Sequence, residues 1–583
     1  MKKTKQERQP IYDKYIGLYR EALNSSSEYR EELRAYMRQY LGSYEIDNST
    51  EPATTVRNVT YELIESQIDP DIPFPKAEPE TFSEQRDALA KSIERLCTAV
   101  REKLPFEALN DMDERYTYIY GGSVWYVEWD NSFDKVGGVR VHCLSPLDFV
   151  AEPGVYDTEN MSYCFLRFTT TKSELQRKYG ADPDSLTLAE CEYSYSGEGT
   201  DRDTVTVVIC FYKDEDSDVC RLVFSGDLIL SDTPKCFRRG IQLTEDQSDG
   251  EDTQQTFLDT PTELIDGEKI GLDDKVVAVP YYVPTDFPIV IRRNTRVAPT
   301  LFGLSDCERV RPEQQAINKV ESRILKKLLR AGVTPVMPED ASITLGNSIF
   351  GELIRMRPGE SLDNYGKIDT TPNISQDIAE AERLYDHAKR VLGISDALQG
   401  LDASISESGF ARQLKITRAT ARLETKKRMK YHAYSRLYRM IFRHYLAFFD
   451  GVRSLDYKDI FGNSHPQSFC RHNFIETGSE GVPYYADEYM FSINLNGGDE
   501  YSRDILWQRN LTNLNAGTLG DPSSPATLLR YWQLQKRANF PLAEENVEYF
   551  SSVVAREAES GISGVSTVES KKQEERTNQN ENR

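Results

Sequence analysis

One run of the sequence, residues 305 to 332 (SDCERVRPEQQAINKVESRILKKLLRAG), constrains the fold more than any other. Ser305 is a favourable N-cap, and Glu308 three residues later completes the pattern of a capping box. Pro312 predicts a kink or a later true start, and Gly332 predicts the end of the helix. We therefore expect a long amphipathic helix, because apolar residues recur at helical spacing at Val310, Ile317, Val320, Ile324, Leu325 and Leu328.

A second helix is expected to return along the first. Residues 333 to 374 are punctuated by proline and glycine, which is typical of short strands and turns, and residues 375 to 392 regain helical periodicity. Two helices joined by a compact insertion form a hairpin. One partner helix of about 18 residues cannot cover the whole apolar stripe of the first helix. We therefore predict that Ile317, Ile324 and Leu328 pack between subunits.

A polar loop, residues 393 to 409, leads into a very long helix expected at 410 to 449. The first half of this helix is dense in lysine and arginine, and its second half is dense in aromatic residues. We interpret these side chains as a solvated or inter-subunit face, because no short helix-turn-helix for reading DNA accompanies them. Further helices are expected at 499–515, at 525–538 and from 543 onward, followed from about 560 by a polar tail that is predicted to be disordered.

The N-terminal half changes from helical to strand character. Helical periodicity covers residues 11–41, 58–66 and 82–118. β-branched and aromatic runs separated by turn residues then predict a mostly antiparallel sheet. At 583 residues the chain should form two or more domains, of the α+β class. The expected strands are 122–129, 139–143, 163–169, 204–212, 219–224 and 276–283, with a strand pair within 474–491 and a long exposed acidic loop at 244–267.

The charge balance limits the functions that the chain can have. There are 71 basic and 94 acidic residues, which gives a formal net charge of −23. A protein that grips the outside of DNA needs a basic surface, so a repressor, a nuclease with a broad DNA groove and a membrane-surface protein are disfavoured. A protein past which DNA slides without sticking is compatible with this charge. The alternative is that the charge only keeps the protein soluble.

Motifs for catalysis and for metal binding are missing. The nearest approach to a P-loop, Gly346 to Gly351, continues with Glu352 and Leu353 where a lysine and a serine or threonine are required. The six histidines and nine scattered cysteines form no zinc tetrad, and the cysteines suit reduced thiols. We predict a non-enzyme with no cofactor and no metal. No apolar run is long enough to span a membrane and no signal peptide is recognised, so we expect the protein to be made in a cytoplasm.

Three stretches resemble the portal proteins of tailed bacteriophages. Residues 58 to 79 (NVTYELIESQIDPDIPFPKAEP) and 391 to 413 are two of them. The third, residues 301 to 332, resembles the portal stem helix, which often has a G-x-S-D/E start and a Q-x-A-I-N-K centre. The matching residues here are Gly303, Ser305, Asp306, Gln315, Ala316, Ile317, Asn318 and Lys319. The resemblance covers roughly residues 10 to 555, and the acidic insertion and the length of the tail depart from it.

The resemblance implies a ring-forming subunit, typically in a dodecamer, with an α/β wing, a helical-hairpin stem, a small β-containing clip and a helical crown. The ring would be the DNA channel at one capsid vertex and would serve DNA packaging, head–tail joining and DNA ejection. Its implied partners are double-stranded DNA passing non-specifically, the terminase motor, the major capsid protein, the scaffolding protein and the head–tail adaptor. It would reside in the virion after assembly in the host cytoplasm. The implied parts are the wing at 1–304 and 410–484, the stem at 305–332 and 375–392, the clip at 333–374, the tunnel loop at 393–409, the crown at 485–559 and a tail at 560–583.

Two groups of residues are candidates for contact with DNA or with an acidic partner. The first is the tunnel loop, which the resemblance places in the channel; its alternative is a plain exposed linker. The second is the basic cluster near the end of the first stem helix, either a positive collar or a set of cations that stabilise the helix C-terminus. The loop residues are Asp402, Ser404, Ser406, Glu407 and Ser408, and the basic cluster is Arg323, Lys326, Lys327 and Arg330.

Two other readings stay open at the level of sequence. One is a monomeric or dimeric nucleic-acid-processing enzyme with an unrecognised site, and the other is a different virion structural protein, such as a minor capsid or tail component. Native mass or negative-stain microscopy separates them from a portal. A closed ring with a central hole favours the portal, and a small compact particle favours the enzyme.

Overall fold

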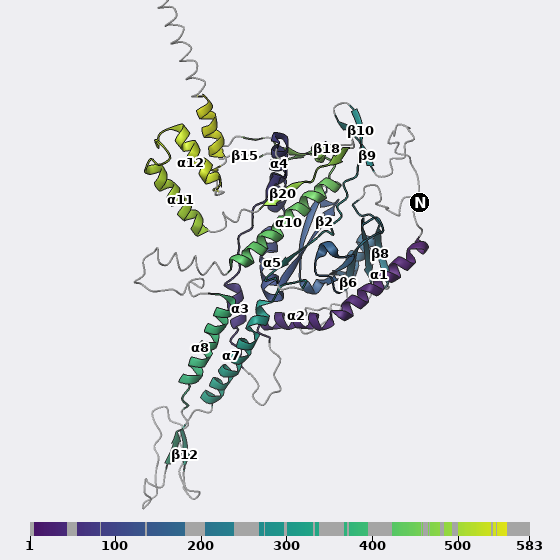
Figure 1. Cartoon of the computed structure of the whole chain (residues 1–583). Helices are drawn as coiled ribbons and strands as arrows, with labels where there is room; N and C mark the ends of the chain where they lie inside the picture. The colour runs from purple at the N-terminus through teal and green to yellow at the C-terminus, as the bar shows by residue number, and fades with distance from the viewer. Residues whose placement is uncertain are drawn as a thin grey trace, which may run out of the picture.

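The computed structural model shows a mixed helix and sheet protein of the α+β class, with a sheet-containing body and a projecting helical hairpin (Figure 1). We use the word wing from here on only as a label for this body, which comprises the described residues before Asp306 and from 423 to 492. The structure describes residues 5–43, 55–81, 83–133, 137–180, 204–237, 267–272, 275–296, 300–329, 333–336, 366–369, 372–394, 423–455, 457–458, 464–465, 467–478, 483–492, 500–537, 540, 542–543 and 545–556.

The N-terminal helices differ in one respect from the prediction. A single helix was expected over 11–41, but the chain forms α1 (Lys5–Ser25) and α2 (Ser27–Tyr40). The break is at Ser26, whose hydroxyl donates to the carbonyl oxygen of Ala22 at 2.8 Å, and such a side-chain bond competes with the regular helix. The short helix expected at 58–66 is confirmed as α3 (Val59–Glu65), with Asn58 as its N-cap.

The helical region expected at 82–118 is divided at Pro105. It forms α4 (Glu84–Lys103) and α5 (Phe106–Tyr120), and Leu104 between them is extended because the residue before a proline is pushed out of the helical conformation. α5 ends at Gly121, which has a φ of +85°. A Cβ atom at Gly121 would lie 2.1 Å from the carbonyl oxygen of Gly303, so this close approach requires glycine.

The predicted antiparallel sheet consists of two larger sheets and several strand pairs. All of the described strand pairings are antiparallel. The three-stranded sheet has the order β11-β2-β3 and the five-stranded sheet has the order β4-β5-β6-β7-β8. These strands are β2 (Gly122–Asp130), β3 (Gly138–Leu144), β4 (Phe149–Ala151), β5 (Tyr163–Thr171), β6 (Thr204–Lys213), β7 (Val219–Ser225), β8 (Leu228–Thr233) and β11 (Ile289–Arg293).

The two sheets pack face to face. Alternate residues of each strand point to opposite sides, so one face of each sheet contacts the other sheet and the opposite face is left for helices. On β2, Val124 and Tyr126 face the five-stranded sheet, whereas Trp125 and Val127 face α4 and the helix α10 (Glu424–Phe448). The far side of the five-stranded sheet is covered by α1. The short helix α6 (Lys172–Tyr179) continues from β5. The wing is therefore layered as helix, sheet, sheet and helix.

The smaller strands confirm one expectation and add a pairing that the sequence did not predict. A strand pair was predicted within 474–491, and β18 (Ile475–Thr477) does pair with β19 (Pro483–Tyr485). The last strand of that stretch, β20 (Tyr489–Ser492), instead pairs with β1 (Lys76–Pro79), more than 400 residues away in the sequence, which no local pattern reveals. The other short pairs are β9 (Gly267–Leu272) with β10 (Lys275–Pro280), β14 (Arg453–Ser454) with β17 (Ser468–Phe469), and β15 (Tyr457–Lys458) with β16 (Ser464–His465).

The aromatic half of the long helix was misinterpreted. We expected a solvated or inter-subunit face, but four aromatic side chains of α10 lie in the wing core and are at most 1% exposed: Tyr434, Tyr438, Phe442 and Tyr445. Tyr434, for example, lies with its ring centroid 5.5 Å from that of Trp125. An amphipathic pattern identifies a buried face, but it does not say which surface covers that face.

The C-terminal helices α11 (Glu500–Asn515) and α12 (Pro525–Arg537) agree with the predicted ranges. Aromatic rings join them, and the ring centroid of Trp507 is 6.3 Å from that of Tyr531 and 5.3 Å from that of Phe540. Among the described helices, none combines the length and the apolarity needed to cross a membrane.

Candidate functional site

The candidate site is the hairpin formed by α7 (Asp306–Leu329) and α8 (Ser375–Leu392), which are side by side in Figure 1 with β12 at their far end. α7 continues through Pro312 without ending there. Between the two helices, β12 (Val333–Val336) pairs with β13 (Gly366–Asp369), so the insertion contains the strands that its sequence predicts. α8 has the predicted bounds and ends at Gly393, which has a φ of +79°.

The base of the hairpin is fixed to the wing by apolar and polar contacts. Val310 and Ile317 of α7 are buried against Val59 and Leu63 of α3, together with Tyr385 of α8. The start of α7 is held by the predicted N-cap, because the backbone N–H of Glu308 donates to the Ser305 hydroxyl at 3.3 Å. Buried Gln314 adds a further tie, since its side-chain oxygen accepts from the backbone N–H of Thr60 at 2.9 Å.

Contacts of carboxylates with basic side chains connect the two helices in an antiparallel arrangement. At the far end, the Asp377 carboxylate lies 2.5 Å from Lys327 and 3.4 Å from Arg323. Near the base, Nδ1 of His387 lies 2.8 Å from Glu313. Asp377 also lies in the first turn of α8, where a negative charge interacts favourably with the helix dipole.

One further arginine links the hairpin to the wing. Arg57 contacts Glu382 of α8 at 2.9 Å and lies 3.8 Å from Glu321 of α7. Burial alone would lower the pKa of Arg57, but the contact with Glu382 and the nearby carboxylates outweigh burial and raise the pKa above its usual value. The guanidinium therefore stays charged and bridges three parts of the subunit.

The far half of α7 leaves apolar side chains exposed in the single subunit. Leu325 is 40% exposed, Leu328 is 49% exposed and Leu329 is 76% exposed. On α8, Ile378 is 46% exposed. The three residues predicted to pack between subunits therefore differ: Ile317 is fully buried within the subunit, Ile324 is half-buried and Leu328 faces solvent. Ile317 packs with residues of α3 and α8 and has no exposed surface in the single subunit.

The structure brings together part of the predicted basic cluster. Arg323 and Lys327 converge on Asp377, and Lys326 is half-buried beside them. Arg323 and Lys327 remain 50% and 38% exposed in these pairs, and both interpretations of the cluster stay open. The remaining predicted site residues lie outside the described part of the chain: Arg330, Asp402, Ser404, Ser406, Glu407 and Ser408.

Sequence reasoning missed the acidic partners of the hairpin. Asp377 was not singled out, although it lies on the line of Ala381, Tyr385 and Ala388 that α8 buries. The sequence did contain a signal for this pair. Asp377 is a carboxylate on the apolar stripe of α8, and the hairpin places it opposite the basic end of α7. Glu313 and His387 could not be paired from sequence, because their contact depends on the relative shift of the two helices.

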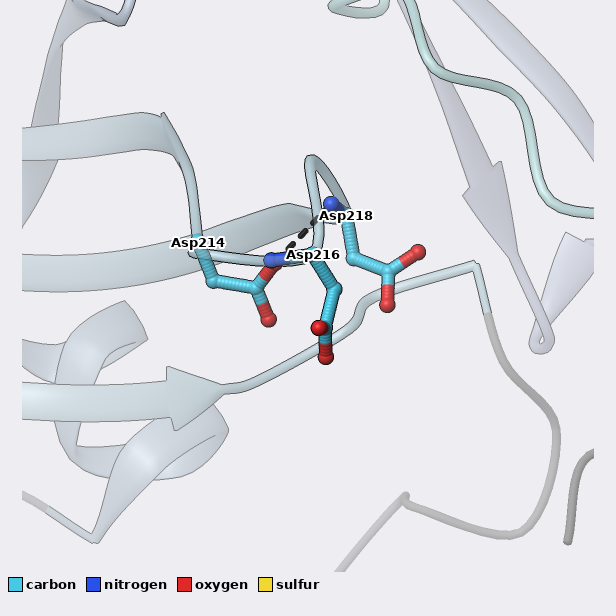
Figure 2. Close-up of side chains that lie close together, drawn as sticks. All are labelled: Asp214, Asp216 and Asp218. Carbon is cyan, nitrogen blue, oxygen red and sulfur yellow. Dashed lines mark hydrogen bonds between the residues drawn. The ribbon is translucent and has the colours of Figure 1, made fainter.

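A second cluster, formed by Asp214, Asp216 and Asp218, lies in the turn between β6 and β7 (Figure 2). Its carboxylate oxygens lie within 4.8 Å of one another, a spacing that could hold a metal ion. The ammonium group of Lys235 already contacts two of them, at 2.8 Å from Asp216 and 3.1 Å from Asp218. Asp214 accepts from the backbone N–H groups of Asp216 and Asp218, at 3.0 and 2.9 Å. These contacts explain the cluster as a turn held by Lys235 and by backbone N–H groups.

The comparisons with known proteins add no relative to this geometry. The chain matches no model of a protein family, and it matches none of the curated proteins.

Proposed function

We propose that this chain is the subunit of a phage portal, a ring at one capsid vertex through which double-stranded DNA enters and leaves. The observation that carries the proposal is the α7–α8 hairpin. It projects from the wing, has the β12–β13 pair at its far end and exposes Leu325, Leu328 and Leu329. Copies arranged around an axis would cover these side chains. The three stretches that resemble portal proteins favour the same arrangement.

The charge of the chain is consistent with a channel for passage. Each subunit contributes a formal charge of −23, and a ring multiplies it. An acidic lumen repels phosphates, so that DNA moves without deep binding wells. By resemblance, the insertion at the hairpin end would dock the terminase motor during filling and the head–tail adaptor afterwards, and the major capsid and scaffolding proteins would be further partners of the ring. The ring would be a homo-oligomer, typically a dodecamer.

The test is the oligomeric state of the full-length protein and of three variants, measured by native mass and negative-stain microscopy. The wild-type protein should form closed rings with a central hole. Ile324→Asp and Leu328→Asp should abolish rings while circular dichroism still reports a folded subunit, because both changes place a charge in the predicted interface. The matched control is Val452→Asp, at a wing residue that is 70% exposed, and it should form rings.

Rings that persist in both hairpin variants would exclude the hairpin from the interface, and a wild-type protein that is only a compact monomer would refute the portal. The leucine variant keeps the test valid if Ile324→Asp misfolds, because Leu328 already faces solvent.

A further inference from the structure

A group of buried charges lies where the first residues of α7 meet the first turns of α10 and the neighbouring wing residues, away from the exposed half of the hairpin. Every charged member has a relative exposure below 10%, except Asp69, which is partly buried. We call it the charge junction. Its members are Asp69, Asp113, Glu114, Arg292, Asp306, Lys426 and Lys430.

The first turns of α10 enter this junction through two lysines. The ammonium group of Lys426 donates to Asp306 at 2.6 Å and to the side-chain oxygen of Gln67 at 2.8 Å. One turn later, Lys430 donates to the carbonyl oxygen of Asp69 at 2.9 Å and lies 3.1 Å from Glu114. Both lysines are among the least exposed charged residues, so water cannot replace these contacts without local opening.

The first residue of α7 enters the junction from the other side. Asp306 is fully buried, and its second carboxylate oxygen accepts from the side-chain amide of Asn294 at 2.9 Å. Deeper in the junction, Arg292 bridges Asp113 and Glu114. Burial alone would raise the pKa of Glu114, but the charges of Arg292 and Lys430 lower the pKa below its ordinary value. The carboxylates of the junction are therefore held in place by fixed cations.

The chain segment between α8 and α10 is anchored to the start of α7 at both of its described ends. On one side, Leu392 and Ile394 at the end of α8 are buried in the same apolar cluster as Val310 of α7. On the other side, Lys426 of α10 contacts Asp306, only four residues before Val310. The described residues on both sides of that segment therefore meet the hairpin at the same short stretch, the start of α7.

We propose that the Lys426–Asp306 pair is a tie that makes the first turn of α7 and the first turns of α10 open and close as one unit. A displacement of the first turns of α10 reaches the base of the hairpin through this pair. The tie is a property of the folded subunit, so it does not depend on ring formation. The pair joins two helix ends that are 120 residues apart in the sequence.

The experiment is amide hydrogen exchange on the full-length protein, followed by mass spectrometry. Lys426→Met removes the ammonium group and keeps the length of the side chain. Exchange should rise about tenfold or more in both residues 308–316 and residues 426–432, as expected for a lost bond between charged groups, while the five-stranded sheet keeps its wild-type protection. The matched control is Arg428→Met on the same helix, whose pair with Glu424 is exposed, and it should leave residues 308–316 unchanged.

The reciprocal variant Asp306→Asn retains an oxygen for Asn294 but removes the charge, and it should produce the same two-site pattern. It also keeps the test decisive if Lys426→Met does not fold. The double variant should exchange no faster than the faster single variant, because both changes remove one interaction. Faster exchange in α10 alone, additive effects in the double variant, or a uniform loss of protection that includes the five-stranded sheet would each overturn the proposal.

Discussion

α10 and α7 are helices of nearly equal length, with 25 and 24 residues, but they complete their burial in different ways. From Tyr431 onward, α10 buries its apolar face within the wing. α7 buries Val310 and Ile317 near its start, yet it leaves Leu325, Leu328 and Leu329 exposed near its end. The wing therefore supplies its own core, whereas the hairpin carries apolar surface that folding of one subunit does not use.

Charges follow the same division. In the wing, Arg292 is 1% exposed and contacts two carboxylates that are fully buried. In the hairpin, the cations that contact Asp377 remain 38% and 50% exposed. Water and salt therefore reach these two hairpin pairs but do not reach the pairs of Arg292. Substitutions of buried wing residues should therefore lower the free energy of unfolding of the subunit. Substitutions in the far half of the hairpin should mainly weaken the association of subunits.

The largest expected difference comes from the same substitution made in both helices. Leu437→Ala in α10 removes a fully buried side chain and should reduce the free energy of unfolding by about 2–5 kcal/mol. Leu329→Ala in α7 removes a side chain that is 76% exposed and should change it by less than about 0.5 kcal/mol. Urea denaturation at a concentration where the protein is monomeric measures both values. Equal losses for the two variants would contradict the division between wing and hairpin.

The sequence predicts those helices and strands that can be recognised from the residue pattern within the segment itself. The periodicity of residues 305 to 332, the proline and glycine punctuation after it and the return helix at 375 to 392 together predict the hairpin. The strands β2, β5, β6 and β7 were predicted from their β-branched and aromatic runs. These patterns are enough to predict the elements, because the spacing of apolar residues within each segment shows both its type and which of its faces is buried.

Long-range relations could not be predicted in this way. The aromatic residues of α10 indicate a buried face, but only the fold shows that Trp125 and the strands of the three-stranded sheet cover it. The contact of Lys426 with Asp306 depends on how α10 crosses the start of α7. Ile317 was assigned to an interface for the same reason, since the sequence does not reveal that α3 lies over it. Tertiary packing decides these positions, and helical periodicity alone does not.

The pH dependence of the free energy of unfolding tests whether water is excluded from the wing core, and the expected effect is of intermediate size. His444 of α10 is buried, and its Nδ1 donates to the carbonyl oxygen of Met440 at 2.8 Å. Burial lowers the pKa of His444 from 6.5 to about 4. Between these two values the unfolded chain binds a proton that the folded chain does not, so stability falls as the pH is lowered through this window. The loss should be about 2 kcal/mol between pH 7.5 and pH 5.

The measurement is the free energy of unfolding in urea at both pH values, for the wild-type protein and for His444→Gln. Glutamine does not titrate, so the variant should lose this part of the pH dependence even if it is less stable at pH 7.5. An unchanged pH dependence in the variant would show that water reaches His444, and it would remove the contrast with the solvent-facing His387 of the hairpin.

The smallest effect is expected at the far end of the hairpin. Asp377→Asn removes the charge that Lys327 and Arg323 share but keeps a side chain of the same shape. Because both cations are partly exposed, the loss of stability should be only about 1 kcal/mol at low salt. At 1 M NaCl the screening length falls to about 3 Å, so the difference from the wild-type protein should shrink to near zero. Unfolding in urea at both salt concentrations measures it. A difference that persists at high salt would mean that the pair is as dry as the contacts of Arg292, and the hairpin would then have to be regarded as an extension of the wing core.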